Sequence, residues 1–171
     1  MKLTERLKSI FTGKGKDHAM KLQEYLSEQG VWFEPHEHPA AYTSQEMAAE
    51  EHVSGNAVAK PVTVHADDKY VMCVLPASCK LDMDKASAAL KAKKVRLADE
   101  EEMSKLFADA EVGAEPPFGN LYDIPTVMDQ RLDSVNEIVC QAGSHKQAVR
   151  MKLEDYKKLV QPQVADLAVH L

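Results

Sequence analysis

The sequence predicts an α+β domain in which a mixed, mainly antiparallel β-sheet is surrounded by helices. Three observations support this fold class. Extended apolar segments outnumber helical ones along the 171-residue chain. Many connections between these segments are too short for the crossovers that parallel strands need. Apolar residues make up 44% of the chain and charged residues 28%, an ordinary composition for one globular domain with a proper core.

The first predicted elements precede the two longest strands. Asp17 is the predicted N-cap of a helix over residues 17–29, and Gly30 supplies its C-terminal stop. Residues 31–39 then run extended. The sequence TSQE has the pattern of a capping box and opens a second, short helix over residues 43–52.

Strands over residues 55–65 and 69–77 are predicted to pair across the turn ADD. Beyond this hairpin, Asp82 and Asp99 are the predicted N-caps of two further helices. The remaining predicted elements, in chain order, are helix 83–92, strand 95–98, helix 100–110, an irregular loop over 111–121, strands 124–129, 136–142 and 148–153, and helix 154–160.

Charge and hydropathy argue against several classes of function. The net charge of −6 is unfavourable for broad, non-specific nucleic-acid binding. No apolar run approaches the roughly 18 residues that a membrane span needs, so we expect no membrane partner. The N-terminus lacks the apolar region of a secretory signal, and Cys73, Cys79 and Cys140 have the pattern of reduced thiols. These features predict a cytoplasmic protein.

The chain divides into three predicted parts: a basic amphipathic arm with its linker over residues 1–16, one domain over 17–160 and a C-terminal tail over 161–171. Residues 1–16 carry a net charge of +4, which leaves −10 on the rest of the chain. Apolar residues of the arm share one helical face, and the sequence TGKGKD after them indicates a flexible joint. The arm could dock on the domain, on a partner subunit or on an anionic surface.

One lysine interrupts a segment that otherwise has the pattern of a buried strand. In GNAVAKPVTVH, residues 55–65, the side chains of Val58, Val62 and Val64 share one face of an extended chain. Lys60 stands among them, and an ammonium group is costly to remove from water. Lys60 is therefore either an edge residue whose ammonium group reaches solvent or part of a site that receives an anion.

Two glycine-containing loops are candidates for a reaction site. In GAEPPFG, Gly113, Gly119 and two prolines fix a backbone that is neither helix nor strand. Such a loop either presents free backbone N–H groups to a developing oxyanion or forms a tight surface turn. In GSHK, Ser144 and His145 lie at a hairpin tip or in the wall of a pocket. The sequence contains neither a nucleotide-binding glycine motif nor a serine-hydrolase elbow.

Two further groups of polar residues leave their role open. His36 and His38 are two residues apart on one strand face, but no further ligands stand at zinc-like spacing, so we expect no metal. A packed or hydrogen-bonded pair of histidines is the expectation. The segment LKAKKVR forms a local basic strip that either contacts a phosphate backbone or is the solvated end of a helix. The basic strip consists of Lys91, Lys93, Lys94 and Arg96.

Several segments, in a fixed order, resemble one known family. They are HPAAYTSQEMAAEEHV, AVAKPVTV, YVMCVLPA, VGAEPPFG, VMDQRL and IVCQAGSHKQAVRM followed by EDY. Together they are similar to the YbaK and prolyl-tRNA-synthetase-associated editing family of aminoacyl-tRNA deacylases, over roughly residues 18 to 160. The lysine after a small residue in the first long strand and the later G-x-x-x-P loop are the characteristic features.

The resemblance implies a fold and a set of site residues. The implied fold is a mixed, barrel-like sheet surrounded by helices, with a pocket that holds the 3′ end of a charged tRNA. By the resemblance Lys60 is the functional lysine, Gly113 and Pro117 belong to the G-x-x-x-P motif, and Lys60 and Gly113 are expected to act in catalysis. The expected substrate-binding residues are His36, Thr43, Ser44, Pro117, Phe118, Gly119, Asp129, Ser144 and His145.

The implied reaction is hydrolysis of the ester that joins a wrong amino acid to its tRNA, with a prolyl-type tRNA carrying a small amino acid as the expected substrate. Pro61 stands where alanine-selective members tend to carry asparagine, and His36 where several cysteine-type members have tyrosine, so the amino acid stays open. The chemistry fits without a protein nucleophile, because an aminoacyl ester is already activated and responds to binding, orientation and oxyanion stabilisation.

No cofactor is expected. The expected partners are the 3′ end of an aminoacyl-tRNA and an aminoacyl-tRNA synthetase, with the chain itself as a monomer or a weak homodimer. Two alternatives to a deacylase stay open at this point. One is a non-catalytic tRNA-binding or synthetase-associated module that keeps the fold. The other is a pocket protein that binds a small carboxylate near Lys60.

Overall fold

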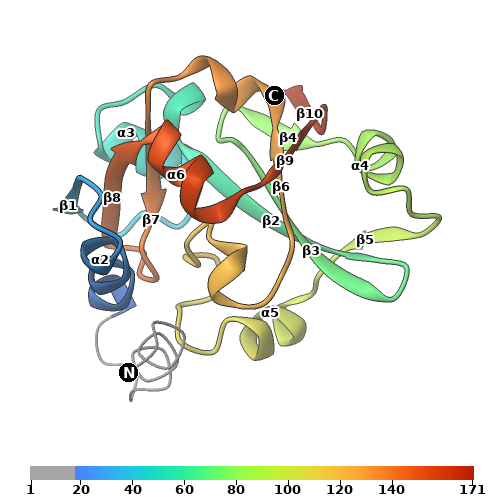
Figure 1. The fold of residues 1–171 in the computed structure, drawn as a ribbon, viewed down its shortest axis with the longest axis horizontal. Helices are drawn as coiled ribbons and strands as arrows, with labels where there is room; N and C mark the ends of the chain where they lie inside the picture. The colour runs from blue at the N-terminus through green and yellow to red at the C-terminus, as the bar shows by residue number, and fades with distance from the viewer. Residues whose placement is uncertain (1–17) are drawn as a thin grey trace.

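A five-stranded sheet carries the predicted hairpin at its centre (Figure 1). The computed structural model describes residues 18–171, with side chains from residue 21 onward. β2 and β3 pair antiparallel along their whole length, with Lys60 opposite Leu75, whereas β6 and β9 join the sheet in parallel. In order across the sheet, the strands are β5 (Val95–Leu97), β2 (Ala59–Ala66), β3 (Lys69–Pro76), β6 (Thr126–Asp129) and β9 (Gln163–Ala165).

Two smaller sheets lie beside this one. All their strand pairs are antiparallel, so antiparallel pairing predominates in the described residues, as predicted. A bridge between Val58 and Val139 joins the start of β2 to β7. The first small sheet has the order β1 (Phe33–Glu37), β8 (Gln147–Lys152) and β7 (Glu137–Gln141), and the second pairs β10 (Ala168–His170) with β4 (Cys79–Leu81).

Three of the helices, α3, α4 and α5, begin at the residues that the sequence predicts. Thr43, Asp82 and Asp99 each accept a hydrogen bond from the backbone N–H three residues further on, which satisfies a donor that the helix cannot. In the first of these caps the Glu46 carboxylate reaches the N–H of Tyr42 instead of completing a reciprocal capping box. The helices are α2 (His18–Glu28), α3 (Ser44–Glu50), α4 (Met83–Leu90), α5 (Glu100–Leu106) and α6 (Leu153–Val160), with 3₁₀ turns η1 (Gly55–Ala57), η2 (Gly119–Leu121) and η3 (Gln130–Ser134).

Three clusters of buried apolar side chains hold these layers together. The largest packs α2 and α6 against one face of β3 and β6 and against β7 and β8. The second lies on the other face of β2 and β3, next to α4 and β10. The third places α3 over Val58 at the entry to β2. Since both faces of β2 and β3 are covered, the central hairpin is held rigidly, and so is any side chain that it presents.

The C-terminal segment differs from the prediction. The sequence predicts a tail over residues 161–171, but these residues add β9 to the large sheet and pair β10 with β4. The buried Asp129 carboxylate accepts the N–H of Leu167 at 2.8 Å, and Arg131 donates to the carbonyl oxygen of Ala168 at 2.7 Å. Strands of three residues are too short to show an alternating pattern, so these tertiary contacts are what define them.

Two further expectations concern the shape of the sheet and the N-terminal arm. The described strands form three sheets and not a closed barrel, and the predicted α+β class with a mixed, mainly antiparallel sheet is confirmed. The predicted arm over residues 1–16 and the predicted cap Asp17 lie outside the described residues. Among residues 18–171, no helix combines the length and the apolar character that crossing a membrane requires.

Candidate active site

A pocket of about 310 Å³ opens where separate segments of the chain meet. β2 contributes Lys60 and Pro61, residues 42–45 at the start of α3 form a second wall, and the loop before η2 contributes Gly113 and Glu115. Ala77 and Leu171 complete the lining. Four sequence-predicted site residues therefore come together here: Lys60, Gly113, Thr43 and Ser44.

The ammonium group of Lys60 is held in place but is not neutralised. It donates to the carbonyl oxygen of Cys79 at 2.5 Å, and no ion pair joins it to a carboxylate among residues 18–171. Its side chain is half-buried, and this burial lowers the pKa of Lys60. An ammonium group has three donors, so one bond to a neutral carbonyl leaves its charge available. Anion binding and a role in catalysis both stay predictions for Lys60.

The backbone N–H of Gly113 is not free. It donates to the carboxylate of Glu115 at 3.0 Å, inside the same loop. Gly113 has a φ of +87°, in the region that favours glycine, and this conformation turns its N–H toward the Glu115 side chain. The expectation of a free N–H group that points at an oxyanion therefore does not describe the loop in this structure.

The other end of this loop is anchored in the core. The hydroxyl of Tyr156 donates to the carbonyl oxygen of Pro117 at 2.6 Å, and the Phe118 ring packs edge-to-face on Tyr156 and Tyr25. Gly119 is buried, and a Cβ there would overlap the Thr126 hydroxyl and the Ile124 carbonyl. None of the three predicted substrate-binding residues Pro117, Phe118 and Gly119 lines the pocket, so they fix the loop instead.

The turn between β7 and β8 is hydrogen-bonded to the loop that contains Gly113. Gly143 donates to the carbonyl oxygen of Ala114 at 2.8 Å. The ring nitrogens of His145 lie 3.1 Å from the Ala41 carbonyl oxygen and 3.0 Å from that of Val112. His145 thus joins the two walls of the pocket, whereas the Ser144 hydroxyl accepts the N–H of Lys146 within the turn. Neither side chain lines the pocket itself.

Two predicted site residues, His36 and Asp129, lie elsewhere in the fold, and so does His38. His36, in β1, forms a 2.7 Å contact with Glu51, and His38 lies 2.7 Å from the carbonyl oxygen of Pro39. The described residues contain no cluster of three or more His, Cys, Asp or Glu side chains arranged for a metal ion. Asp129 is fully buried and accepts the N–H groups of Arg131 and Leu167, so it anchors the chain instead of contacting substrate.

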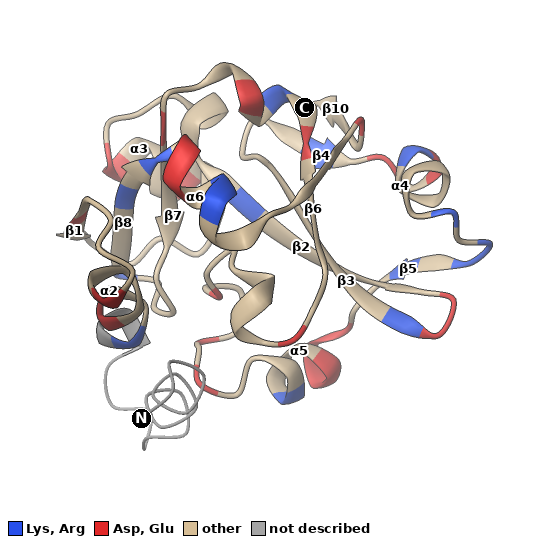
Figure 2. Cartoon of the chain, viewed as in Figure 1, with Lys and Arg blue, Asp and Glu red and all other residues tan. Residues whose placement is uncertain are grey.

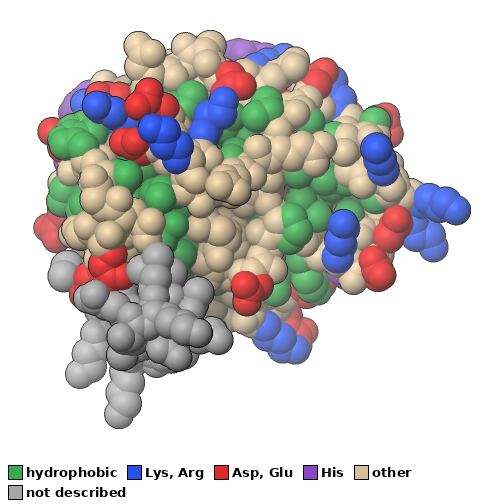
Figure 3. All heavy atoms as spheres, in the orientation of Figure 1, with side chains coloured by type: hydrophobic (Ala, Val, Ile, Leu, Met, Phe, Trp, Pro, Cys, Tyr) green, Lys and Arg blue, Asp and Glu red, His purple; other side chains and the backbone are tan. Residues whose placement is uncertain are grey.

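The basic strip lies at another end of the molecule, around α4 and β5 (Figure 2). Arg96 donates to both carboxylate oxygens of Glu102, at 2.7 and 3.0 Å, so its charge is already paired. The backbone N–H groups of Lys93 and Lys94 bind Asp67, and both side chains are exposed. On the face shown in Figure 3, acidic and basic side chains are interspersed. Contact with a phosphate backbone stays a prediction for the three lysines of the strip, and Arg96 is a poor candidate for it.

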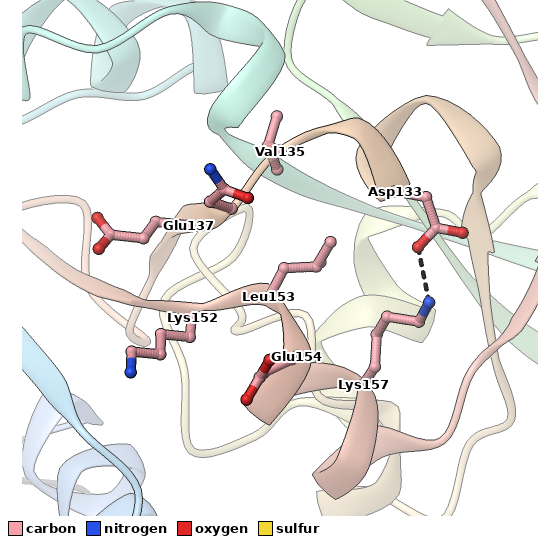
Figure 4. Close-up of a pocket in the computed structure, with 8 residues that line it drawn as sticks. Asp133, Val135, Glu137, Lys152, Leu153, Glu154 and Lys157 are labelled. Atoms are coloured by element: carbon pink, nitrogen blue, oxygen red, sulfur yellow. Dashed lines mark hydrogen bonds and ion pairs between the residues drawn. The ribbon is translucent and has the colours of Figure 1, made fainter.

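A second hollow, of about 440 Å³, lies between η3, β7 and the start of α6 (Figure 4). Lys157 forms a 2.7 Å ion pair with Asp133 across it. Glu137, Lys152 and Glu154 also line it, so charges of both signs face the same space. No sequence-predicted site residue lies here, and the mixed charges favour no particular ligand.

Tyr42 and Glu115 are among the residues of the pocket wall that reasoning from sequence missed. Tyr42 is 69% exposed and its ring centre lies 4.8 Å from that of His145. Glu115 is only 4% exposed although it lines the pocket. Both stand in segments that the sequence singled out for other reasons, the helix-capping pattern and the glycine–proline loop. A carboxylate inside such a loop is the signal that would have found Glu115.

Comparison with known proteins gives a consistent result. Residues 38–159 match the model of the aminoacyl-tRNA editing domain. A solved candidate trans-editing enzyme for prolyl-tRNA synthetase is similar, with a TM-score of 0.80, 23% identity and coverage of 90% of this chain and 98% of that one. The hypothetical protein APE2540 is similar with a TM-score of 0.78, 21% identity and coverage of 86% and 99%. At such identities the two structures support the fold alone.

Proposed function

The chain belongs to the aminoacyl-tRNA editing domain family, and on this premise we propose that it is a freestanding deacylase that hydrolyses the ester of mischarged tRNA in trans. The observation that carries the proposal is the pocket around Lys60, where a half-buried ammonium group with no carboxylate partner among the described residues lines an open cavity. A phosphate or a developing oxyanion would supply the partner that this charge lacks.

The proposed substrate is a prolyl-type tRNA that carries a small wrong amino acid. The cavity volume of about 310 Å³ stands at the lower end of ligand pockets, which fits the end of a tRNA with a small aminoacyl group. Resemblance to proteins associated with prolyl-tRNA synthetase supports the choice of tRNA. The same proposal places the chain in the cytoplasm, with that synthetase as a second partner.

In the proposed reaction, water attacks the ester carbonyl carbon and Lys60 stabilises the negative charge that develops on the carbonyl oxygen. The bond from that carbon to the ribose oxygen then breaks, which releases the free amino acid and restores the ribose hydroxyl of the tRNA. The neighbouring ribose hydroxyl of the substrate activates the water, so no side chain has to act as nucleophile. Two of the three cysteine thiols, those of Cys73 and Cys140, fit the role of a nucleophile poorly. Burial raises the pKa of Cys73 and that of Cys140 to about 12, which leaves little thiolate at neutral pH.

One observation favours a second candidate function, a non-catalytic tRNA-binding module. The Gly113 N–H, which would otherwise be an oxyanion donor, is occupied by the Glu115 carboxylate. A pocket that holds the tRNA end without stabilising an oxyanion would bind and protect the ester. The two candidates differ in turnover and not in affinity.

A panel of mischarged and correctly charged tRNAs tests the proposal. We expect the chain to release a small wrong amino acid from proline tRNA at least about tenfold faster than it releases proline. The measurement is the loss of acid-precipitable labelled amino acid over time, with tRNA binding followed in parallel. Binding to the panel without release of any amino acid would contradict the proposed deacylase and support the binding module.

A further inference from the structure

The carboxyl group of Glu115 is a second ionisable group of the pocket wall that forms no ion pair among the described residues. Glu115 is 4% exposed, lines the same cavity as Lys60 and has no ion-pair partner among residues 18–171. Burial raises the pKa of Glu115, while the backbone N–H groups of Glu115 itself and of Gly113, and the nearby His145 ring, which forms no ion pair with Glu115, act in the opposite direction. A buried carboxylate without a cation is costly, so a ligand that brings a positive charge would stabilise it.

The substrate of the proposed reaction carries such a charge. An aminoacyl ester has an α-ammonium group one carbon away from the ester carbonyl, and this group distinguishes it from other esters. We propose that Glu115 binds the α-ammonium group of the aminoacyl ester and thereby selects esters with a free α-amine. This inference rests on the proposed function and adds a determinant of specificity to it.

The opposite charges of the two residues also orient the ester. Lys60, on β2, repels the α-ammonium group and attracts the ester oxygen or a phosphate, whereas Glu115, in the loop, does the reverse. The two side chains form no ion pair with each other, so each is available to the substrate. A substrate with both charges therefore has one favourable orientation in the pocket. The anchors of the loop at Tyr156 and His145 hold the carboxyl group at this position.

The experiment compares two esters that differ in this group alone. Alanyl-tRNA and lactyl-tRNA, both on proline tRNA, carry an ammonium and a hydroxyl group at the same carbon. Single-turnover rates are measured for the wild-type chain, Glu115→Gln and, as a control, the exposed Glu100→Gln in α5. We expect the wild-type chain and Glu100→Gln to prefer the alanyl ester by about 10- to 100-fold, because a charge-assisted hydrogen bond is lost with the lactyl ester.

Glu115→Gln should reduce this preference to within about threefold by slowing the alanyl ester only. The amide keeps an acceptor for the Gly113 N–H, so the variant should fold, and its melting temperature checks this. The inference is overturned if Glu115→Gln keeps the full preference, if the wild-type chain has none, or if the variant slows both esters equally. The last result would mean that Glu115 positions the loop.

A binding measurement separates failure of this inference from failure of the proposed function. Proline tRNA that ends in 3′-amino-3′-deoxyadenosine forms amide-linked alanyl and lactyl analogues that are not hydrolysed. If the chain turns over neither ester, its affinities for these two analogues still test Glu115. We expect at least tenfold tighter binding of the alanyl analogue, and loss of that difference in Glu115→Gln. Equal affinities in the wild-type chain would overturn the inference even if the chain is a deacylase.

Discussion

Replacing Gly119 by alanine tests the view that this glycine is structural. The added Cβ would overlap the Oγ1 of Thr126 and the carbonyl oxygen of Ile124. The Thr126 side chain could rotate, but the Ile124 carbonyl is backbone. The turn is fixed because the N–H groups of Ile124 and Tyr122 both donate to the Gly119 carbonyl oxygen at 2.9 Å. The clash can therefore be relieved only by moving the turn.

The expected cost follows from these contacts. Overpacking of a buried site costs typically about 1–3 kcal/mol, and a clash with fixed backbone belongs at the upper end of that range. Gly119 does not have a positive φ, so alanine adds no left-handed strain and returns a few tenths to 1 kcal/mol through the unfolded chain. The net loss in free energy of unfolding is about 2–3 kcal/mol. For a domain of this size, the melting temperature should fall by about 4–12 °C.

Equilibrium unfolding in urea measures this loss, and Gly55→Ala provides the control. A Cβ at Gly55 would come no closer than 3.4 Å to the backbone nitrogen of Ser78, so this variant should stay within about 1 kcal/mol of wild type. Below both transitions, Gly119→Ala should deacylate within about threefold of the wild-type rate. Unchanged stability would refute the packing argument. Normal stability of Gly119→Ala together with lost activity would indicate that Gly119 contacts the substrate.

Three further predictions concern the pocket and the basic strip. Alanine at position 113 would be strained at φ +87°, so Gly113→Ala should lower the free energy of unfolding in urea by about 1–2 kcal/mol. Because the substitution should also displace Glu115, single-turnover deacylation should slow at least about tenfold. A wild-type rate would contradict the role of the loop. Burial raises the pKa of Glu115, so the wild-type protein loses stability as pH rises above the unfolded-state pKa of about 4.3. Gln cannot ionise, so the melting temperature of Glu115→Gln relative to wild type should increase as pH is raised from about 4 to about 7. A constant difference in melting temperature across that range would refute it. Charge reversal of Lys93 and Lys94 should lower the log–log salt slope of tRNA binding by about 1.4–1.8, and an unchanged slope would remove the basic strip from the interface.

Local signals account for the parts of the fold that were predicted correctly. The caps at Asp82 and Asp99 and the central hairpin depend on residues close in sequence, which is why their patterns are readable. The same holds for Lys60, because a lone ammonium group in a strand pattern already demands a partner. The pocket that Lys60 lines was predicted through a family resemblance and not through its geometry.

The features that were missed depend on contacts between distant segments. β10 exists because β4 and Arg131 bind it, and nothing in its three residues indicates a strand. The Gly113 N–H was expected to be free because glycine–proline patterns indicate the path of the backbone but not which side chain bonds to it. In the structure, the Glu115 carboxylate accepts a hydrogen bond from this N–H. The role of Gly119 also depends on a carbonyl group five residues away, brought close by the turn.

The most direct test of the proposed deacylase is the single-turnover rate of Lys60→Met with mischarged proline tRNA at saturating enzyme, because saturation separates the chemical step from tRNA binding. Lys80→Met, which removes an exposed ammonium group from β4, is the matched control. Loss of a group that stabilises charge in the transition state typically costs about 100-fold or more. We predict a loss of at least that size for Lys60→Met and a rate within about twofold of wild type for Lys80→Met. A wild-type rate for a folded Lys60→Met variant would contradict the assignment of this pocket as the active site.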